Sequence, residues 1–293
     1  MRKTGDVAKE NKRIKGRLLK SVDPYLAITP YLMRDRNDAM VNAFESVDVT
    51  DTMHFIHKMR AEDMPNLGML HLFVASYVRM VSQVPQVNRF ITGQRVYART
   101  NIEVIMTVKK EMRADAPETS IKVVFEPSDI LKDVYEKMNT AISEAKSGND
   151  TSTDTVARWV MSMPRFILRG FMAVIRWMDY HACLPKAIME ASPFHGSMIV
   201  TDVASIGLPP VLHHIYNFGN LPVFTSFGRR YRKNEMDSEG NISQRQYIDY
   251  GIVIDERICD GFTYAKALRI FKNSLKNPYK LMVPPERVFE DVG

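Results

Sequence analysis

The sequence predicts a mixed α/β domain built on a large sheet, and three observations lead to this fold class. Helical and strand-like segments are interspersed along the 293 residues, with no low-complexity linker that would divide the chain. The strand-like segments are rich in short turns typical of β-hairpins, most clearly at 234–241. The composition, with 45% hydrophobic and 25% charged residues, provides enough apolar side chains for a substantial core.

The first half of the chain is predicted to begin with a basic, solvated arm over residues 1–26. Apolar residues then recur at helical spacing, and Thr29 with Pro30 suits a helix start. Strand-like segments follow, one of them around a Thr-Gly turn. The expected order is a helix at 29–44, an extended stretch leading into a helix at 45–60, an apolar core helix at 67–87, and strands at 88–100 and 102–112.

The second half is predicted to combine further strands with helices. In residues 120–148 a strand and a turn are followed by Ser128 as the cap of a helix that ends at Gly148. Together these segments predict one folded domain over residues 27–293. The remaining expected elements are a loop at 148–155, a helical segment at 155–181, strands at 196–204, 222–233 and 246–255, and a final amphipathic helix at 263–275.

Charge and cysteine content narrow the class of partner and the compartment. The formal net charge of +6, from 40 basic and 34 acidic side chains, fits a phosphate-bearing small ligand or an acidic surface and requires no nucleic acid. Cys183 and Cys259 form neither a disulfide framework nor a metal-binding spacing, which favours the reducing cytoplasm and no metal site. No apolar run of about 18 residues predicts a membrane span.

Four segments, taken in order, carry a resemblance to a known family. They are "ITPYLMRDRNDAMVNAF…VDVTDTMHFIHKMR", "LHLFVASYVRMVSQVPQVNRF", "FHGSMIVTDVASIGL" and "DERICDGFTYAKAL". The last is similar to an Asp-His-Arg-x-x-Asp-Gly motif with its trailing helix. Together they resemble the catalytic domain of the dihydrolipoamide acyltransferases of 2-oxoacid dehydrogenase complexes and, more distantly, chloramphenicol acetyltransferase. The match runs from about residue 27 to residue 283.

This resemblance implies a fold, an assembly and a reaction. The implied fold is the chloramphenicol acetyltransferase-like mixed sheet with flanking helices. The implied assembly is a homotrimer with active sites between subunits. The implied reaction is acyl transfer between coenzyme A, as acyl-CoA, and an acceptor that the sequence does not name. The chain has no lipoyl domain or peripheral-subunit-binding domain, which argues against a full core subunit of a dehydrogenase complex.

The resemblance also assigns roles to residues of this sequence. The family's catalytic histidine falls on Glu256, and the hydroxyl that stabilises the tetrahedral intermediate falls on Thr201. Asp260 is expected to brace the site through an arginine, for which Arg34 is the candidate. The other positions that match the motif are Asp255, Arg257 and Gly261. Glu256 is therefore the one departure within the motif.

Three interpretations of Glu256 compete. It is a working general base, or it marks a catalytically inactive scaffold or ligand-binding relative, or it is an ordinary strand-end carboxylate paired with Arg257 or with a neighbouring subunit. A histidine has a pKa about two units below a thiol, whereas a glutamate lies about four units below. Proton transfer from the thiol is then about 3 kcal/mol more uphill, a cost of about a hundredfold in rate if it is fully felt in the barrier. Burial in an apolar channel raises a carboxyl pKa and recovers part of this loss.

Three further histidines are candidates for lining a substrate channel. His213 and His214 are adjacent, and because neighbouring side chains of an extended segment point to opposite faces, at most one is expected to enter the channel. The alternative for both is a surface or interface position. His195 precedes the Thr201 strand, either as a turn residue or as a group at the channel mouth.

The segment 155–181 is the second departure from the family, which has a short polar connection there. No acidic residue appears between Asp154 and Asp179, while Pro164 is expected to break or kink a continuous helix. Such a basic amphipathic helix predicts a peripheral membrane contact, a lid over an acyl channel, or packing on a neighbouring subunit. Four arginines fall within an arc of about 40° on an ideal helix, namely Arg158, Arg165, Arg169 and Arg176.

Overall fold

The computed structural model describes residues 14–109, 118–147 and 158–292. The strands are β1 (Gly16–Leu18), β2 (Met40–Asp48), β3 (Phe90–Thr92), β4 (Arg95–Arg99), β5 (Ile102–Lys109), β6 (Glu118–Phe125), β7 (Met198–Asp202), β8 (Val223–Phe227), β9 (Tyr231–Met236) and β10 (Ile242–Asp255). The α-helices are α1 (Pro24–Leu32), α2 (Thr50–Glu62), α3 (Met69–Gln83), α4 (Leu131–Lys146), α6 (Arg165–Tyr180), α7 (Lys186–Ala191) and α8 (Gly261–Lys276). Short 3₁₀ turns lie at Arg36–Ala39, Pro85–Asn88, Ala204–Ile206 and Pro278–Leu281.

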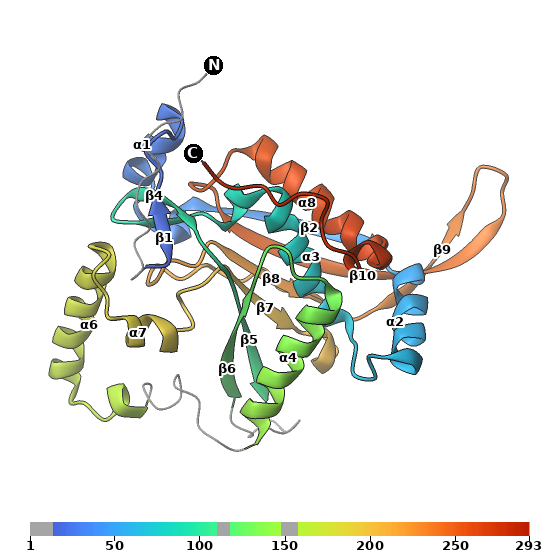
Figure 1. Ribbon diagram of the computed structural model, residues 1–293, viewed down its shortest axis with the longest axis horizontal. Helices are drawn as coiled ribbons and strands as arrows, with labels where there is room; N and C mark the ends of the chain where they lie inside the picture. Colours follow the sequence, from blue (N-terminus) through green and yellow to red (C-terminus); the bar gives the residue numbers. More distant parts are fainter. Residues whose placement is uncertain (1–13, 110–117, 148–157, 293) are drawn as a thin grey trace.

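A large mixed sheet forms the centre of the molecule (Figure 1). Its strands follow the order β2-β10-β8-β7-β5-β6, and β9 pairs with the first half of β10. The pairs β5–β7 and β7–β8 are parallel, and the others are antiparallel. The mixed α/β fold predicted from the sequence is thereby confirmed. A smaller sheet has the order β1-β4-β3.

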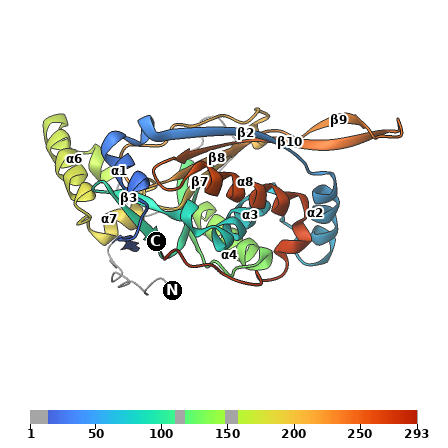
Figure 2. The same cartoon turned by 90° about the horizontal axis from the view of Figure 1, so that it is seen from above.

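Helices α3, α4 and α8 lie along one face of the large sheet and bury the main core (Figure 2). The core helix predicted at 67–87 is α3. Phe73 of this helix stacks on Phe227 of β8, with ring centroids 4.3 Å apart, and meets Phe271 of α8 edge-on. Because α3 is enclosed between the sheet and its neighbours, nearly all of its residues are buried.

The other face of the sheet is covered in part by an irregular segment, residues 203–222. Side chains alternate along β7, so Val200 joins the main core while Ile199 points to the opposite face. There Ile199 shares a second cluster with Ile215 and Leu221 of the irregular segment. The segment that follows Thr201 is therefore attached to the sheet by its own apolar contacts.

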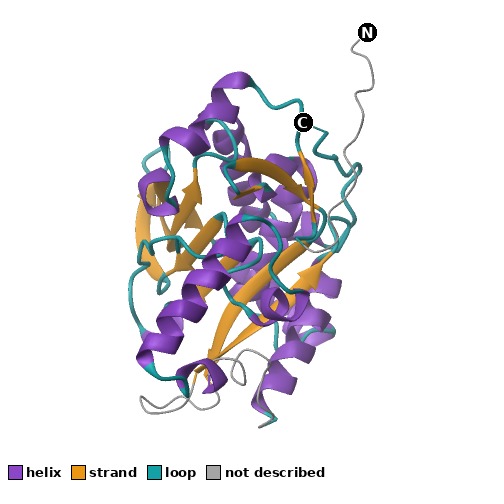
Figure 3. Ribbon diagram, turned by 90° about the vertical axis from the view of Figure 1, so that its left-hand side faces the viewer, coloured by secondary structure: helices purple, strands orange, loops and turns teal. Residues whose placement is uncertain are grey.

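The small sheet, α6 and α7 make up one end of the molecule, which Figure 3 shows face-on. Phe90 of β3, Ile175 of α6 and Met189 of α7 share a third buried cluster. In Figure 1 this end lies on the left, with α6 at the outer margin. The helix is attached to the fold along one side only.

Two predictions in the first half of the chain are wrong. The helix expected at 29–44 is replaced by α1, which ends at Leu32, and by β2, which begins at Met40. The reason is long-range pairing, because β2 pairs antiparallel with β10 along its whole length and its side chains alternate in exposure. The basic arm is also shorter than expected, because Ile14 is buried and β1 pairs with β4. Residues 1–13 lie outside the described residues.

Two helix and strand boundaries also differ from expectation. The helix α4 begins at Leu131, because the Asp133 carboxylate accepts a bond from the Ile130 N–H at 2.9 Å, and Ser128 lies outside it. The interruption of the helical segment at 155–181 was expected, because Pro164 immediately precedes α6. The strand expected at 222–233 is divided into β8 and β9, which pair with different parts of β10. The predicted loop at 148–155 and Gly148 lie outside the described residues.

A buried ion network fixes the end of β10. Asp255 and Arg257 are each 1% exposed, and the Arg257 guanidinium donates to both Asp255 carboxylate oxygens at 2.7 Å. Arg257 also donates to the carbonyls of Met33 and Arg34 at 2.9 and 3.0 Å. The buried Arg36 lies 3.7 Å from Asp255, and it donates to the carbonyls of Asn217 and Ile91. Burial lowers the pKa of Arg36, while Asp255 opposes that shift.

We expect Asp255→Asn to lower the free energy of unfolding by about 3–5 kcal/mol, because it leaves two buried guanidinium groups without their carboxylate. The measurement is denaturant unfolding at neutral pH. The matched control is Asp249→Asn, on the same strand, whose carboxylate is only partly buried and accepts from Ser46 and Tyr231. Equal losses of stability in the two variants would contradict the role given to Asp255.

Candidate active site

The candidate catalytic residue Glu256 follows directly on β10. Its backbone N–H donates to the carbonyl of Ala39 at 2.9 Å, while the preceding N–H, of Asp255, donates to Pro222 at 2.9 Å. Both sequence neighbours of Glu256 are buried, whereas Glu256 itself is exposed. The chain therefore holds this carboxylate outward at a position fixed on both sides by buried charges.

Glu256 lines a pocket of about 400 Å³ between α1, the end of β10 and the start of α8. Helix α1 forms one wall of this pocket. The helix begins at Pro24 with Asp23 as its cap, and both residue types are typical of helix starts. Cys259 also lines the pocket, and burial raises the pKa of its thiol to about 12. It is the packed, unreactive thiol that its apolar neighbours indicate. The other lining residues are Asp23, Tyr25, Leu26, Thr29, Met33, Val41, Ile254, Asp260, Gly261 and Tyr264.

Asp260 caps α8 in this structure. Its carboxylate accepts bonds from the Thr263 N–H at 2.8 Å and from the Thr263 hydroxyl at 2.9 Å, and the N–H bond lowers the pKa of Asp260. Gly261 is the first residue of the helix. The side chain of Arg34 lies elsewhere: it is exposed and lines a second pocket, of about 470 Å³, beside α6. Within the described residues of one chain, the expected contact between Asp260 and Arg34 is not formed.

The second predicted site residue, Thr201, is half-buried on β7 and lies beside His213. Its hydroxyl oxygen is 3.5 Å from His213 Nε2 and 3.5 Å from the Thr225 carbonyl oxygen. The His213 ring stacks on Phe224 with centroids 4.3 Å apart, which fixes its plane. Burial lowers the pKa of His213, so its imidazole is neutral at pH 7 and able to accept a proton.

The two other candidate histidines lie differently. His214 is exposed and its ring meets Tyr216, so only His213 of the adjacent pair turns toward Thr201. His195 is 1% exposed, and its ring nitrogens contact Ser192 Oγ at 2.8 Å and Asp179 Oδ1 at 3.0 Å. Its burial and these two partners connect α6 to the segment before β7, and in the single chain His195 does not reach the surface.

Within one chain, Glu256 and Thr201 are too far apart to act together. Thr201 is in register with Ser226 of β8, and Ser226 is in register with Gly251 of β10. Glu256 lies five residues further along, about 16 Å at about 3.3 Å per residue, and two strand spacings add about 10 Å across. The resulting separation is roughly 19 Å. In the described chain the two candidate residues therefore lie in two separate regions, each at most one half of a site.

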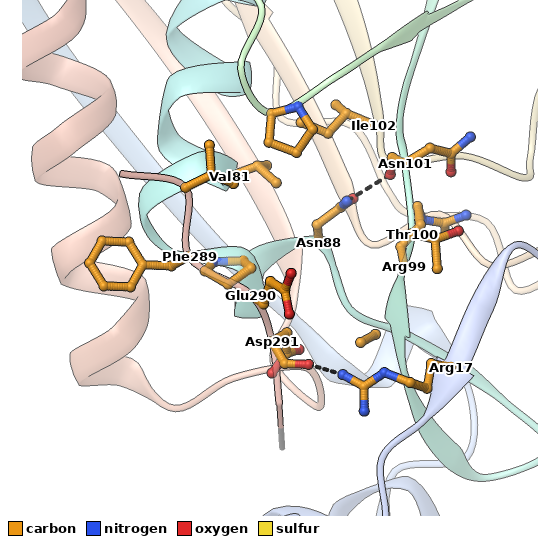
Figure 4. Close-up of a pocket in the computed structure, with 14 residues that line it drawn as sticks. Arg17, Val81, Asn88, Arg99, Thr100, Asn101, Ile102, Phe289, Glu290 and Asp291 are labelled. Atoms are coloured by element: carbon orange, nitrogen blue, oxygen red, sulfur yellow. Dashed lines mark hydrogen bonds between the residues drawn. The ribbon is translucent and has the colours of Figure 1, made fainter. Parts of the chain in front are cut away.

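A third pocket, of about 320 Å³, lies where the C-terminal segment returns to the fold (Figure 4). The carboxylate of Asp291 accepts two bonds from Arg89, at 2.6 and 2.7 Å, and the Asp291 carbonyl accepts from Arg17. Asn88 donates to the Asn101 carbonyl at 2.9 Å across the pocket. The hydrogen bonds from Arg89 and Arg17 to Asp291 therefore attach the C-terminal segment to the fold. Among the described residues, no three His, Cys, Asp or Glu side chains are grouped to hold a metal ion.

Sequence reasoning missed two parts of this arrangement. The first is helix α1 as a wall of the pocket. Its start was not predicted because the helix was placed at 29–44, although Asp23 followed by Pro24 is a helix-start signal. The second is the contact between Asp179 and His195. These residues are separated in the sequence, and no local sequence pattern predicts their contact. The positions of Glu256 and Asp260 came from the resemblance to the Asp-His-Arg-x-x-Asp-Gly motif, and that of Thr201 from the resemblance of the segment FHGSMIVTDVASIGL.

Solved structures of acyltransferases share this architecture. The chain is 14% identical to a probable dihydrolipoamide acetyltransferase from Listeria monocytogenes, with a TM-score of 0.56, covering 87% of this chain and 92% of that one. It is 12% identical to the dihydrolipoamide acetyltransferase of Azotobacter vinelandii, with a TM-score of 0.58 and coverages of 88% and 89%. That enzyme has been investigated for the catalytic roles of a serine, a histidine and an asparagine.

Chloramphenicol acetyltransferase is a further match, 10% identical with a TM-score of 0.56, covering 89% of this chain and all of that one. No protein-family model and no curated protein matches the sequence. At these identities the likeness concerns the fold alone. The chain has the chloramphenicol acetyltransferase-like fold that its sequence motifs predicted.

Proposed function

We propose that this chain transfers an acyl group between coenzyme A and an acceptor, in a site shared between copies of a homotrimer. Glu256 of one copy is the proton acceptor, and Thr201 of another copy donates a hydrogen bond to the developing oxyanion. The observation that carries the proposal is the placement of Glu256, held exposed in a pocket of about 400 Å³ at the end of β10.

The likeness of the fold supports the assignment of Glu256 to the base position. In the Azotobacter enzyme the histidine and asparagine investigated for catalytic roles are four positions apart, which is the spacing of Glu256 and Asp260 here. Asp260 contributes by capping α8, which fixes the helix that lines the pocket. The two cysteines are unpaired, which is compatible with a reaction in the cytoplasm.

Exposed apolar side chains beside each half-site support the shared site. Beside Glu256, Tyr25 is 79% exposed and Phe262 is 84% exposed. Beside Thr201, the segment 206–212 exposes four apolar residues, Ile206, Leu208, Val211 and Leu212. Contiguous apolar surface of this kind marks interaction sites. Burying both surfaces against a second copy brings the base of one chain to the hydroxyl of the next.

His213 gives the Thr201 half-site a second proton-accepting group. Its Nε2 lies 3.5 Å from the Thr201 hydroxyl oxygen, and its imidazole is neutral at pH 7. In the assembled site Glu256 and His213 would then face the reacting atoms from opposite chains. The His213 imidazole would then supply, from the other chain, the histidine that is absent from the motif at position 256. The Glu256 carboxylate would act beside it.

A second candidate function is the binding of acyl-CoA without transfer. The observation that favours it is the identity of Glu256, because a carboxylate is a weaker base than an imidazole toward a thiol. The same pocket would then hold a ligand, and the chain would be an inactive relative of the fold.

We expect Glu256→Gln to reduce the release of free thiol from acetyl-CoA by about a hundredfold or more, because loss of a general base typically costs that much. The measurement is a thiol-detection assay with thiol, alcohol and amine acceptors, one class at a time. The matched control is Glu62→Gln, an exposed glutamate at the end of α2, which leaves the rate unchanged.

A second variant separates the two candidate functions. If Glu256→Gln equals the wild-type protein while Glu256→His gains activity, Glu256 is no base and the native chain is the inactive relative. Binding of acetyl-CoA without turnover in calorimetry would support that same alternative.

A further inference from the structure

The helix α6 presents two apolar faces, and only one of them is packed. Ile175 is buried in the third cluster, with Phe171 and Met178 partly buried beside it. Phe166 and Trp177, on the other side, are 77% and 60% exposed. Ile167 and Val174 extend this outward stripe and are exposed as well. On a helix these four outward positions span an arc of about 100°, the width of a face that packs against a surface.

The rotation of α6 is fixed, so the stripe cannot turn inward. Asp179 contacts His195 at 3.0 Å and accepts from the Gly219 N–H at 3.1 Å, on the inner side of the helix. Tyr180 donates to Gln94 at 2.7 Å. Gly93 adopts a φ of +56°, and a Cβ there would lie 2.6 Å from the Tyr180 carbonyl oxygen. The end of the helix is therefore held closely against the hairpin turn of the small sheet.

The charge on this surface has one sign. Arg165, Arg169 and Arg176 are exposed and lie within an arc of about 40°, beside the apolar stripe. Asp179, the one acidic residue of α6, faces inward to His195. The outer side of the helix thus combines apolar and aromatic side chains with three guanidinium groups and no carboxylate.

We propose that α6 docks the protein on an anionic lipid surface, with the apolar stripe at the level of the upper acyl chains and the arginines among the phosphate headgroups. A basic amphipathic helix lying in the interface has this distribution of side chains, and tryptophan is enriched at that depth. The formal net charge of +6 and the three exposed arginines of α6 favour an anionic surface as the occupant.

The depth of contact is limited to the interface. Among the residues that the structure describes, no helix is long and apolar enough to cross a membrane. The helix α6 has 16 residues, about 24 Å at 1.5 Å per residue, with arginine in its first, second and fourth turns. The inner side of α6 stays on the protein, so binding requires no change in the fold.

The chain carries its own probe for this contact. Its two tryptophans, Trp159 and Trp177, both belong to this region and are 58% and 60% exposed. Intrinsic fluorescence is to be recorded with vesicles of mixed phosphatidylglycerol and phosphatidylcholine at low salt, and with vesicles of phosphatidylcholine alone. We expect a blue shift and co-sedimentation with the anionic vesicles, quenching by lipids brominated in the acyl chain, and none of these with the neutral vesicles.

Two variants test the two components of the surface. Replacing Arg165, Arg169 and Arg176 by glutamine weakens binding by about fivefold per arginine, the factor for about 1 kcal/mol per basic residue at an anionic surface. Phe166→Ser is expected to weaken binding with the charge unchanged. The matched controls are Arg232→Gln and Ile242→Ser on the exposed β9–β10 hairpin, which bind as the wild-type protein does.

Three results would overturn the proposal. One is the absence of sedimentation with anionic vesicles at low salt. Another is sedimentation without a blue shift, which would place the contact on a different surface. The third is a blue shift on concentrating the protein without lipid, which would assign the stripe to contact between copies of the chain.

Discussion

The buried ion pair between Asp255 and Arg257 is the interaction on which the rest of the candidate site depends. Arg257 joins the end of β10 to the carbonyls that follow α1, and Arg36 extends the same network toward β3. One charged cluster thereby sets the position of a strand end and a helix relative to each other. Removing one member of the cluster would leave a buried charge without its partner, which is strongly destabilising. Glu256, between Asp255 and Arg257, is held outward as a consequence.

The same rigidity explains why one chain holds only half of the proposed site. Thr201 and Glu256 lie on strands whose register keeps them about 19 Å apart, and the sheet cannot shift by less than a full register step. In the proposed trimer, the exposed apolar residues beside Glu256 and beside Thr201 would be covered by a second copy of the chain. His213 lies beside Thr201 and away from Glu256, so in the proposed trimer the two proton-accepting groups would belong to different chains.

Local patterns predicted most of the elements, and long-range contacts account for the errors. The helix α3 and the hairpin of β9 and β10 followed from periodicity and turn residues, which are properties of neighbouring positions. Residues 40–44, the first part of β2, were predicted as helix because only the pairing of the strand with β10 distinguishes the two structures. At the site, the motif located Glu256 and Thr201, but the burial of His195 depends on Asp179, a distant residue of α6. The separation of Glu256 from Thr201 within one chain follows from the sheet register, which no single segment encodes.

The central claim is that Glu256 of one copy and Thr201 of another complete one active site, and co-assembly of two variants tests it most directly. Thr201→Val and Glu256→Gln are each to be purified alone and also after co-expression with separable tags. If sites are shared, each pure variant is inactive and the mixed trimers recover about a third of the wild-type activity, since in either mixed composition one site of three receives both intact residues. Mixed trimers no more active than the two pure variants would contradict the account.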